Sequence, residues 1–253
     1  MSSLSTAELA IYAAFSLPVL YLLFKHGIPG SLGWGYLFLF CSLRVIGGAL
    51  FLADSSAAVI VSNIGLSPLL LSAAGIHHEA VTYRQRNLNT KLEWVKVLQY
   101  HFLVTAGLAL LAVGLSGLQS ADPTANDAKM VKIGAGILTA SWAILMIWSF
   151  YSLCWAPASK DSPVYRLATQ LLVAVIVALV FIGIRVIYTL VALTSNDAKL
   201  NPVTGSLAIR VILSFLPELI AVIIFLIAGL YSRNIRDLAK GRPEPAYELR
   251  GKA

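Results

Sequence analysis

Long apolar runs separated by short polar breaks make up most of this chain. A helix that crosses the hydrocarbon core of a bilayer needs roughly 20 consecutive apolar residues, and each run is close to that length. The break after the second run is only a few residues around Asp54, which predicts a tight antiparallel hairpin. The pattern therefore predicts an all-α bundle of seven transmembrane helices. We place them at about residues 7–24, 31–53, 56–76, 97–118, 131–155, 167–193 and 207–231.

Composition indicates that the bilayer is the solvent of this protein. Hydrophobic residues make up 58% of the 253 residues, charged residues make up 12%, and the mean hydropathy is +0.80. A soluble domain has about 25% charged residues, so this chain has too few to cover its surface. The net charge of +7 comes from residues at helix ends, with no basic stripe carrying interleaved aromatics. We therefore expect membrane lipids as partners, and no nucleic acid.

The distribution of Lys and Arg predicts an orientation. The connectors after the first, third and fifth helices and the C-terminal stretch hold most of them, whereas the opposite side has only Lys129, Lys132 and Lys199. The positive-inside rule then places the N-terminus outside or in a lumen and the C-terminus in the cytosol. We divide the chain into a membrane domain at residues 1–231 and a basic cytosolic tail at 232–253, which we expect to be disordered. The endoplasmic reticulum and the plasma membrane fit equally well.

The longest polar connector is expected between His77 and Lys96. We interpret its second half as a short interfacial helix that holds Trp94 at headgroup level. The adjacent His77, His78 and Glu79 are then expected in a solvated interface or in contact with lipid headgroups. We predict neither a metal nor a cofactor, because adjacent histidines are poor joint ligands on a helix and no aspartate-rich magnesium motif is present.

Four charged residues lie inside the apolar runs. A charge at the centre of a membrane helix costs at least ~2.5–3.5 kcal/mol, so such residues face the bundle interior, pair with one another or contact a ligand. The helical rise places Arg44 roughly 20 Å above the inner end of its helix and Glu218 roughly 16 Å below the outer end of its own. Arg185 and Arg210 fall in the same outer half. We therefore predict one buried polar site in that half.

Other polar side chains accompany these charges. Arg210, Ser214 and Glu218 have the i, i+4, i+8 spacing of one helical face. Pro217 breaks the seventh helix next to Glu218 and frees a backbone carbonyl. As catalytic residues we predict Glu218, which would transfer a proton, and Tyr188, which would orient the substrate. The predicted substrate-binding residues are Arg44, Arg185, Arg210, Asp54, Asn63 and Ser214.

Two interpretations of this site stay open at this point. In the first, Glu218 pairs with Arg44 or Arg185 and the cluster only locks helices together. In the second, the cluster lines a cavity, and its surplus of arginines binds an anionic group such as a carboxylate, a phosphate or an enolate oxygen. Extension of Arg210 to the membrane interface would remove that surplus.

Three stretches carry a family resemblance. Residues 184–188 (Ile-Arg-Val-Ile-Tyr), 201–206 (Asn-Pro-Val-Thr-Gly-Ser) and 217–220 (Pro-Glu-Leu-Ile) resemble an uncharacterised family of fungal seven-helix membrane domains. The resemblance spans about residues 5–235 and implies a fungal origin and seven helices, without an activity. The architecture is more distantly similar to fungal lipid-translocating exporter-like proteins. It is also similar in size to small fungal membrane terpene cyclases, which use intramembrane carboxylates.

From these observations we expect an acid–base cyclase or isomerase for a lipophilic, terpenoid- or polyketide-like substrate. A transporter for lipids or small molecules and a seven-helix sensor or receptor are the alternatives. The inner halves of the last three helices are almost wholly apolar, which counts against transport. Gly33, Gly35, Gly47 and Gly48 permit close packing within or between protomers, so an oligomer stays open.

Overall fold

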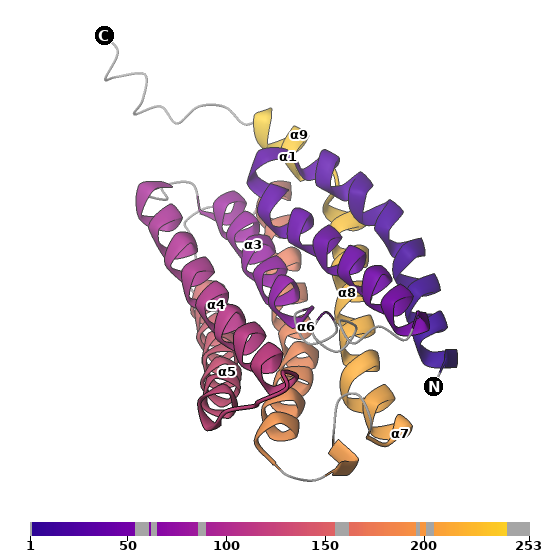
Figure 1. The fold of residues 1–253 in the computed structure, drawn as a ribbon. Coiled ribbons are helices and arrows are strands. Elements are labelled where there is room, and N and C mark those ends of the chain that lie inside the picture. The colour runs from indigo at the N-terminus through magenta and orange to yellow at the C-terminus, as the bar shows by residue number, and fades with distance from the viewer. Residues whose placement is uncertain are drawn as a thin grey trace.

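The computed structural model describes residues 2–53, 61, 65–85, 90–154, 162–195, 198–200 and 205–241, and all regular structure in these residues is helical. The helices pack side by side with their long axes along one direction (Figure 1). Their bounds are α1 Ser2–Leu52, α3 Leu66–Arg84, α4 Thr90–Leu118, α5 Ala125–Cys154, α6 Pro163–Thr194, the 3-10 helix η1 Ala198–Leu200, α7 Leu207–Arg210, the π-helix η2 Val211–Phe215, α8 Leu216–Ser232 and α9 Ile235–Lys240.

Helix α1 consists of two antiparallel arms joined at Gly27. Gly27 has φ +66° and ψ −153°, a backbone conformation that side-chain-bearing residues rarely adopt, and Pro29 removes an amide donor just beyond it. The arms meet along their length: the rings of Tyr12 and Phe40 lie 5.5 Å apart, and a Cβ added at Gly48 would lie 3.0 Å from the carbonyl oxygen of Ser5. The first two predicted helices, 7–24 and 31–53, correspond to these two arms.

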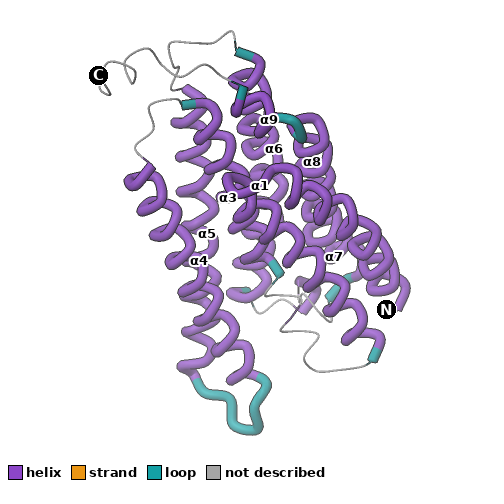
Figure 2. The backbone as a smooth tube through the Cα atoms, turned by 90° about the horizontal axis from the view of Figure 1, so that it is seen from above, coloured by secondary structure: helices purple, strands orange, loops and turns teal. Residues whose placement is uncertain are grey.

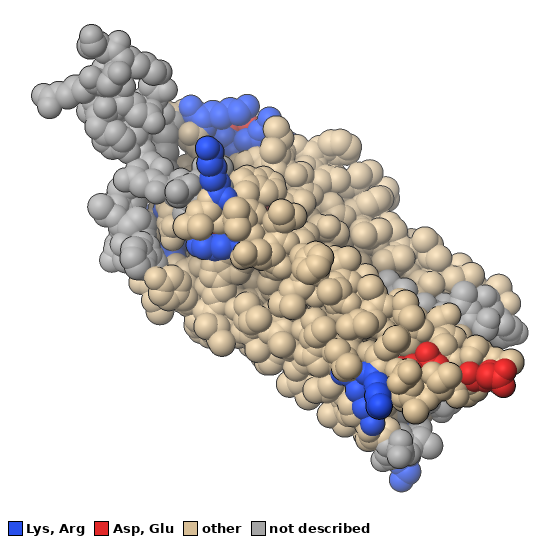
Figure 3. All heavy atoms as spheres, turned by 60° about the vertical axis from the view of Figure 1, so that its left-hand side comes forward, with Lys and Arg blue, Asp and Glu red and all other residues tan. Residues whose placement is uncertain are grey.

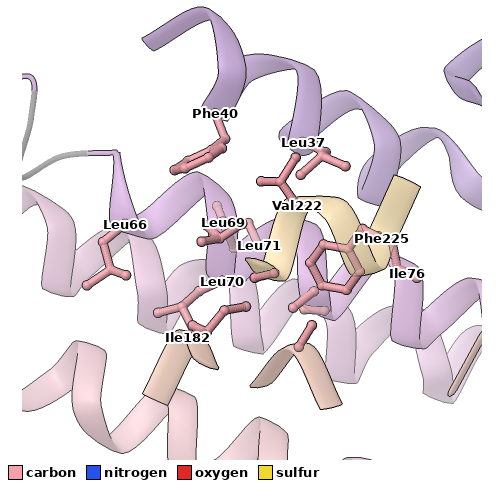
Figure 4. Packing of buried hydrophobic residues seen from close by; sticks show 14 of the residues in the cluster. Leu37, Phe40, Leu66, Leu69, Leu70, Leu71, Ile76, Ile182, Val222 and Phe225 are labelled. Atoms are coloured by element: carbon pink, nitrogen blue, oxygen red, sulfur yellow. The ribbon is translucent and has the colours of Figure 1, made fainter. Parts of the chain in front are cut away.

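Helix α3 is the centre of the bundle. It packs mainly against α1 and α6 and also contacts α4 and α5, and every residue in it except Thr82 and Tyr83 is buried. Gly33 and Gly75 let α1 and α3 approach closely, because a Cβ added at Gly75 would lie only 2.3 Å from the backbone nitrogen of Gly33. Figure 4 shows the apolar side chains that α3, α1, α6 and α8 contribute to this core.

The boundaries of α3 and α4 differ from the sequence prediction. The third helix was expected at 56–76 but runs over Leu66–Arg84, so the first half of the predicted polar connector is part of it. The expected interfacial helix is the first part of α4, which begins at Thr90. His77, His78 and Glu79 are buried rather than solvated, because α3 is surrounded by other helices.

The outside of the bundle is apolar. Side chains such as Ile28, Phe102 and Leu17 are 80%, 77% and 73% exposed, and Figure 3 shows a wide uncharged band between charged residues at the two ends of one face. Among the described residues, five helices are long and apolar enough to cross a membrane. These are Leu4–Leu52, which contains the reversal at Gly27, Lys91–Leu118, Ala125–Cys154, Pro163–Thr194 and Leu207–Ser232.

The two ends of the bundle hold different parts of the chain. The start of α1 and the loop that joins α4 to α5 lie at one end, and α9 lies at the other (Figures 1 and 2). Helix α9 falls inside the stretch that was expected to be a disordered tail. Its Ile235 is buried against Val164 and Ala168 of α6, so the folded part of the chain continues past residue 231. Residues 242–253 lie outside the described part of the chain.

Candidate functional site

Arg44, Arg185 and Glu218 form one buried ionic group, which we call the Arg44 cluster. Oxygen Oε1 of Glu218 accepts a hydrogen bond from Nη2 of Arg44 and another from Nε of Arg185, the latter at 2.7 Å. The three residues are 6%, 2% and 1% exposed. They come from α1, α6 and α8, so Arg44 and Glu218 lie at the same level of the bundle, and Glu218 pairs with both arginines and not with one of them.

The guanidinium of Arg44 is only partly satisfied. Its Nε is buried and has no hydrogen-bond partner among the described residues, and its Cζ lies 5.3 Å from the centre of the Phe40 ring. A Cβ added at Gly65, at the start of α3, would lie 3.5 Å from both Cζ and Nε of Arg44, and no other atom of the described residues would be closer. Its distance to Nη2 is 3.6 Å, so the added Cβ would lie over the face of the guanidinium group, where a methyl-sized space is present.

Arg185 is held by its own helix. Its Nη1 donates to the hydroxyl of Thr189 one turn later, and that hydroxyl donates to the carbonyl of Arg185 at 2.9 Å. Tyr188 contacts Arg185 through its ring, whose centre is 5.7 Å from Cζ, while its hydroxyl donates to the carbonyl of Leu200 at 3.1 Å. Tyr188 is thus next to the Arg44 cluster, with its hydroxyl engaged elsewhere and not with Glu218.

The remaining predicted site residues are less closely associated with the cluster. Arg210 is half-buried and lies over the Phe51 ring at 5.8 Å, and Ser214 is half-buried in η2. Asp54 and Asn63 lie outside the described residues. The single helical face predicted for Arg210, Ser214 and Glu218 assumed a regular α-helix, whereas a π-helix separates the first from the last.

This π-helix follows from Pro217. Proline has no amide hydrogen and its ring clashes with the carbonyl one turn earlier, so the α-helical pattern cannot pass through it. In η2 the amide of Leu216 bonds instead to the carbonyl of Val211, five residues back. Short π-helical turns occur often at functional sites. Here the turn directly precedes Glu218 and sets the angle at which its side chain enters the bundle.

One carboxylate near the cluster was not predicted. Glu8 lies on the first arm of α1, is half-buried, and interacts electrostatically with Arg44, Arg185 and Arg210. It forms no ion pair with them within 4 Å. Its position as the second residue of the first apolar run, 7–24, was the available signal, because a carboxylate there is an exception in the run just as Glu218 is in its own.

A second buried polar group, the His26 cluster, consists of His26, Trp34, Glu79 and the carbonyl of Gly229. The distance from His26 Nδ1 to Glu79 Oε1 is 2.6 Å, and that from His26 Nε2 to the Gly229 oxygen is 3.1 Å. Trp34 Nε1 donates to Glu79 Oε2 at 2.9 Å, and the three side chains are fully buried. At about 1.5 Å per residue, Glu218 and Gly229 are about 16 Å apart along α8, so the two clusters occupy different depths.

The bonds of the His26 cluster determine its proton count. The Gly229 carbonyl can only accept, so Nε2 carries a hydrogen. Nδ1 and Oε1 then share one proton, which makes the pair either imidazolium with carboxylate or imidazole with carboxylic acid. Both forms are neutral overall. No group of three or more His, Cys, Asp and Glu side chains suited to a metal ion occurs in the described part of the chain.

Comparisons with known proteins give a family without an activity. A search of curated proteins finds no match, and a search of solved structures finds none either. One protein family matches residues 1–235, which is most of the chain and includes both clusters. The chain therefore belongs to the family described as Domain of unknown function (DUF7702).

Proposed function

We propose that this protein is an integral membrane protein that binds a lipophilic small molecule through an anionic group at the Arg44 cluster. The observation that carries this proposal is the incomplete satisfaction of Arg44: two guanidinium groups share one carboxylate oxygen, and Nε of Arg44 has no partner among the described residues, while a methyl-sized space lies over the guanidinium face. A buried N–H of a charged group is costly to leave unpaired, so an acceptor there is favoured. The apolar surroundings favour a molecule whose remainder is lipophilic.

The proposal includes seven membrane crossings. The two arms of α1 would contribute two, and α3, α4, α5, α6 and the α7–η2–α8 segment the other five. An odd number agrees with the start of α1 and α9 lying at opposite ends of the bundle (Figure 1). The positive-inside rule would make the α9 end cytosolic and the Arg44 cluster outer or lumenal. The endoplasmic reticulum or plasma membrane and a fungal source remain predictions.

Acid–base chemistry on the bound molecule, as in a cyclase or isomerase, stays part of the proposal with one requirement. Arg44 and Arg185 both donate to Oε1 of Glu218, so a proton would have to be transferred at Oε2, or at Oε1 after one guanidinium group had left it. Tyr188 would have to release the Leu200 carbonyl. The geometry supports anion binding more directly than proton transfer.

Transport is the second candidate, and the His26 cluster favours it. The argument against transport was that the inner halves of the last helices are apolar. Helices α1 and α3 nonetheless bring His26, Trp34 and Glu79 into that half of the bundle. Polar groups at two depths are what a path through the membrane requires. Uptake of the co-purifying molecule into proteoliposomes would distinguish transport from binding alone.

The test uses Arg44→Lys with Arg210→Lys as its matched control. Native mass spectrometry of the purified full chain identifies whatever molecule co-purifies at one per protein. Lysine can keep the charge near Glu218 but lacks Nε, and loss of one charge-assisted hydrogen bond lowers affinity about 10- to 100-fold. We expect Arg44→Lys to lose the molecule and Arg210→Lys to keep it. A folded parent protein with no bound anion would overturn the proposal.

A second pair of variants tests the space beside Arg44. Gly65 has φ −54° and ψ −23°, so alanine fits its backbone, and the added methyl would fill the space next to Nε. We expect Gly65→Ala to fold normally and to lose the bound molecule. Gly136→Ala in α5 is the control, because a Cβ there meets nothing within 4 Å. Equal retention by both variants would exclude this space as part of the binding site.

A further inference from the structure

Two adjoining cavities lie between α4 and α5, far from the Arg44 cluster. The larger, about 390 Å³, is lined mainly by apolar and aromatic side chains, and the smaller, about 170 Å³, by more polar ones. Lys96, Trp148 and Tyr151 line both cavities, so the two form one continuous groove. The other lining residues are Gln99, Tyr100, Leu103 and Ile144 in the larger cavity, and Val81, Gln85, Glu93 and Ser152 in the smaller.

The polarity of the groove changes along the helix axis. The smaller cavity includes Glu93, in the first turn of α4, and Ser152, near the end of α5, so it lies at the helix ends. The larger cavity reaches Leu103 and Ile144, further inside both helices. An amphiphile in a bilayer has the same order, with its polar head at the surface and its chain toward the centre.

The charge around the smaller cavity is positive overall. Lys96 and Glu93 form an ion pair at 2.6 Å and cancel. Arg84 is buried next to this cavity and donates to the carbonyls of Ser152 and Leu153, the latter at 2.8 Å. No carboxylate of the described residues lies within 4 Å of Arg84, and its Nε has no hydrogen-bond partner among them. One cationic charge therefore lacks a counter-ion among the residues that the structure describes.

We propose that this groove binds one anionic phospholipid of the surrounding membrane, with an acyl chain in the larger cavity and the headgroup at the smaller one. Lys96 stands where the two cavities meet and is 42% exposed, so its ammonium group can reach a headgroup phosphate while its stem lies along the chain. Trp148 and Tyr151 are residue types that favour this depth of a membrane. The site is separate from the proposed Arg44 site and does not depend on it.

The test measures lipid retained by the full-length protein. Purified protein in detergent is incubated with equal amounts of phosphatidylglycerol and phosphatidylcholine and analysed by native mass spectrometry. Lys96→Gln removes the cation at the junction, and Lys132→Gln makes the same change at the other end of α5. We expect Lys96→Gln to lower phosphatidylglycerol retention about fivefold and to leave phosphatidylcholine unchanged, whereas Lys132→Gln changes neither.

A second pair of variants blocks the acyl chain without touching a charge. Ile144 lines the larger cavity and Ile147, one turn away and 69% exposed, does not. Ile144→Trp is expected to lower retention of both lipids, and Ile147→Trp to leave them unchanged. Equal binding of the two lipids by the parent protein would overturn the proposal. Equal lipid retention by Lys96→Gln and Lys132→Gln, or by Ile144→Trp and Ile147→Trp, would also overturn it. Arg44→Lys leaves the groove unchanged and should therefore retain phosphatidylglycerol fully. A failure of the Arg44 proposal would then not affect the result for the groove.

Discussion

The Arg44 cluster and the His26 cluster are both buried, and both join α1, another helix and α8, but they differ in charge balance. The Arg44 cluster holds two cations and one carboxylate, and one of its N–H groups has no partner among the described residues. In the His26 cluster both ring nitrogens of His26 and both oxygens of Glu79 have partners, and the pair is neutral in either protonation state.

This difference in charge balance distinguishes the two roles. The His26 cluster is complete without a ligand, whereas the Arg44 cluster lacks, within the described part of the chain, an acceptor for one N–H group and a counter-ion for one charge. A buried polar network whose members are all satisfied rigidifies the structure, whereas a partly satisfied one is costly. We therefore assign the Arg44 cluster to binding, whereas the His26 cluster stabilises the reversal of α1 without a ligand, whether or not a transport path passes beside it. Glu8 moderates the surplus charge of the Arg44 cluster from beyond ion-pair distance but leaves Nε of Arg44 unpaired.

Glu218→Gln is the variant with the largest expected effect. It leaves the buried guanidinium groups of Arg44 and Arg185 without the carboxylate that both contact. Breaking a buried ion pair by removing one partner costs about 3–5 kcal/mol. We expect the free energy of unfolding to fall by about that amount, measured by denaturant unfolding in detergent and followed by tryptophan fluorescence.

The outcome of Glu218→Gln also tests the meaning of the charge surplus. A loss below about 1 kcal/mol would mean that Arg44 and Arg185 are balanced by another group, such as Glu8 or a bound anion, and that Glu218 is not their main partner. Addition of the co-purifying molecule to the variant separates these cases, because ligand that binds only the folded state stabilises it in proportion to its concentration. No recovery would favour Glu8.

The residues of the Arg44 cluster could be identified from the sequence because each is a charged residue within a long apolar run. Arg44, Arg185 and Glu218 each interrupt an apolar run, and the helical rise placed Arg44 and Glu218 at similar depths. Their exact partners were not predictable. The π-helix before Glu218 changes the helical register, and its cause, Pro217, predicts a break without predicting its geometry.

The His26 cluster escaped sequence reasoning because it lies where apolar runs end. A run of His77, His78 and Glu79 resembles a solvated connector when read alone. In the structure α3 is surrounded by protein, and Glu79 finds its partners, His26 and Trp34, on α1 instead of in water. Local composition describes a lipid-facing helix well, whereas a helix at the centre of a bundle need not be apolar along its whole length.

His26→Leu is expected to have the second largest effect. It removes the hydrogen-bond partner of Glu79 Oε1 and leaves the Gly229 carbonyl with one donor fewer. A buried polar group left without its partner costs about 1–3 kcal/mol, so we expect a loss of about 2 kcal/mol in the free energy of unfolding. His101→Leu is the matched control, because the bond of His101 Nδ1 goes only to the Val97 carbonyl of its own helix. Equal losses for the two variants would show that the His26 bonds contribute nothing specific.

Glu79→Gln is expected to have the smallest effect, although it is the same chemical change as Glu218→Gln. Glutamine can donate its amide to Nδ1 of a neutral His26 and accept from Trp34, while Nε2 still donates to Gly229. Every bond of the cluster survives without a net charge, so the loss of unfolding free energy should stay below about 1 kcal/mol. A loss as large as that of Glu218→Gln would mean that Glu79 carries a negative charge balanced from outside the cluster. The guanidinium of Arg236, which packs against Gly27 beside His26, would then be the balancing group, and the His26 cluster would be ionic like the Arg44 cluster.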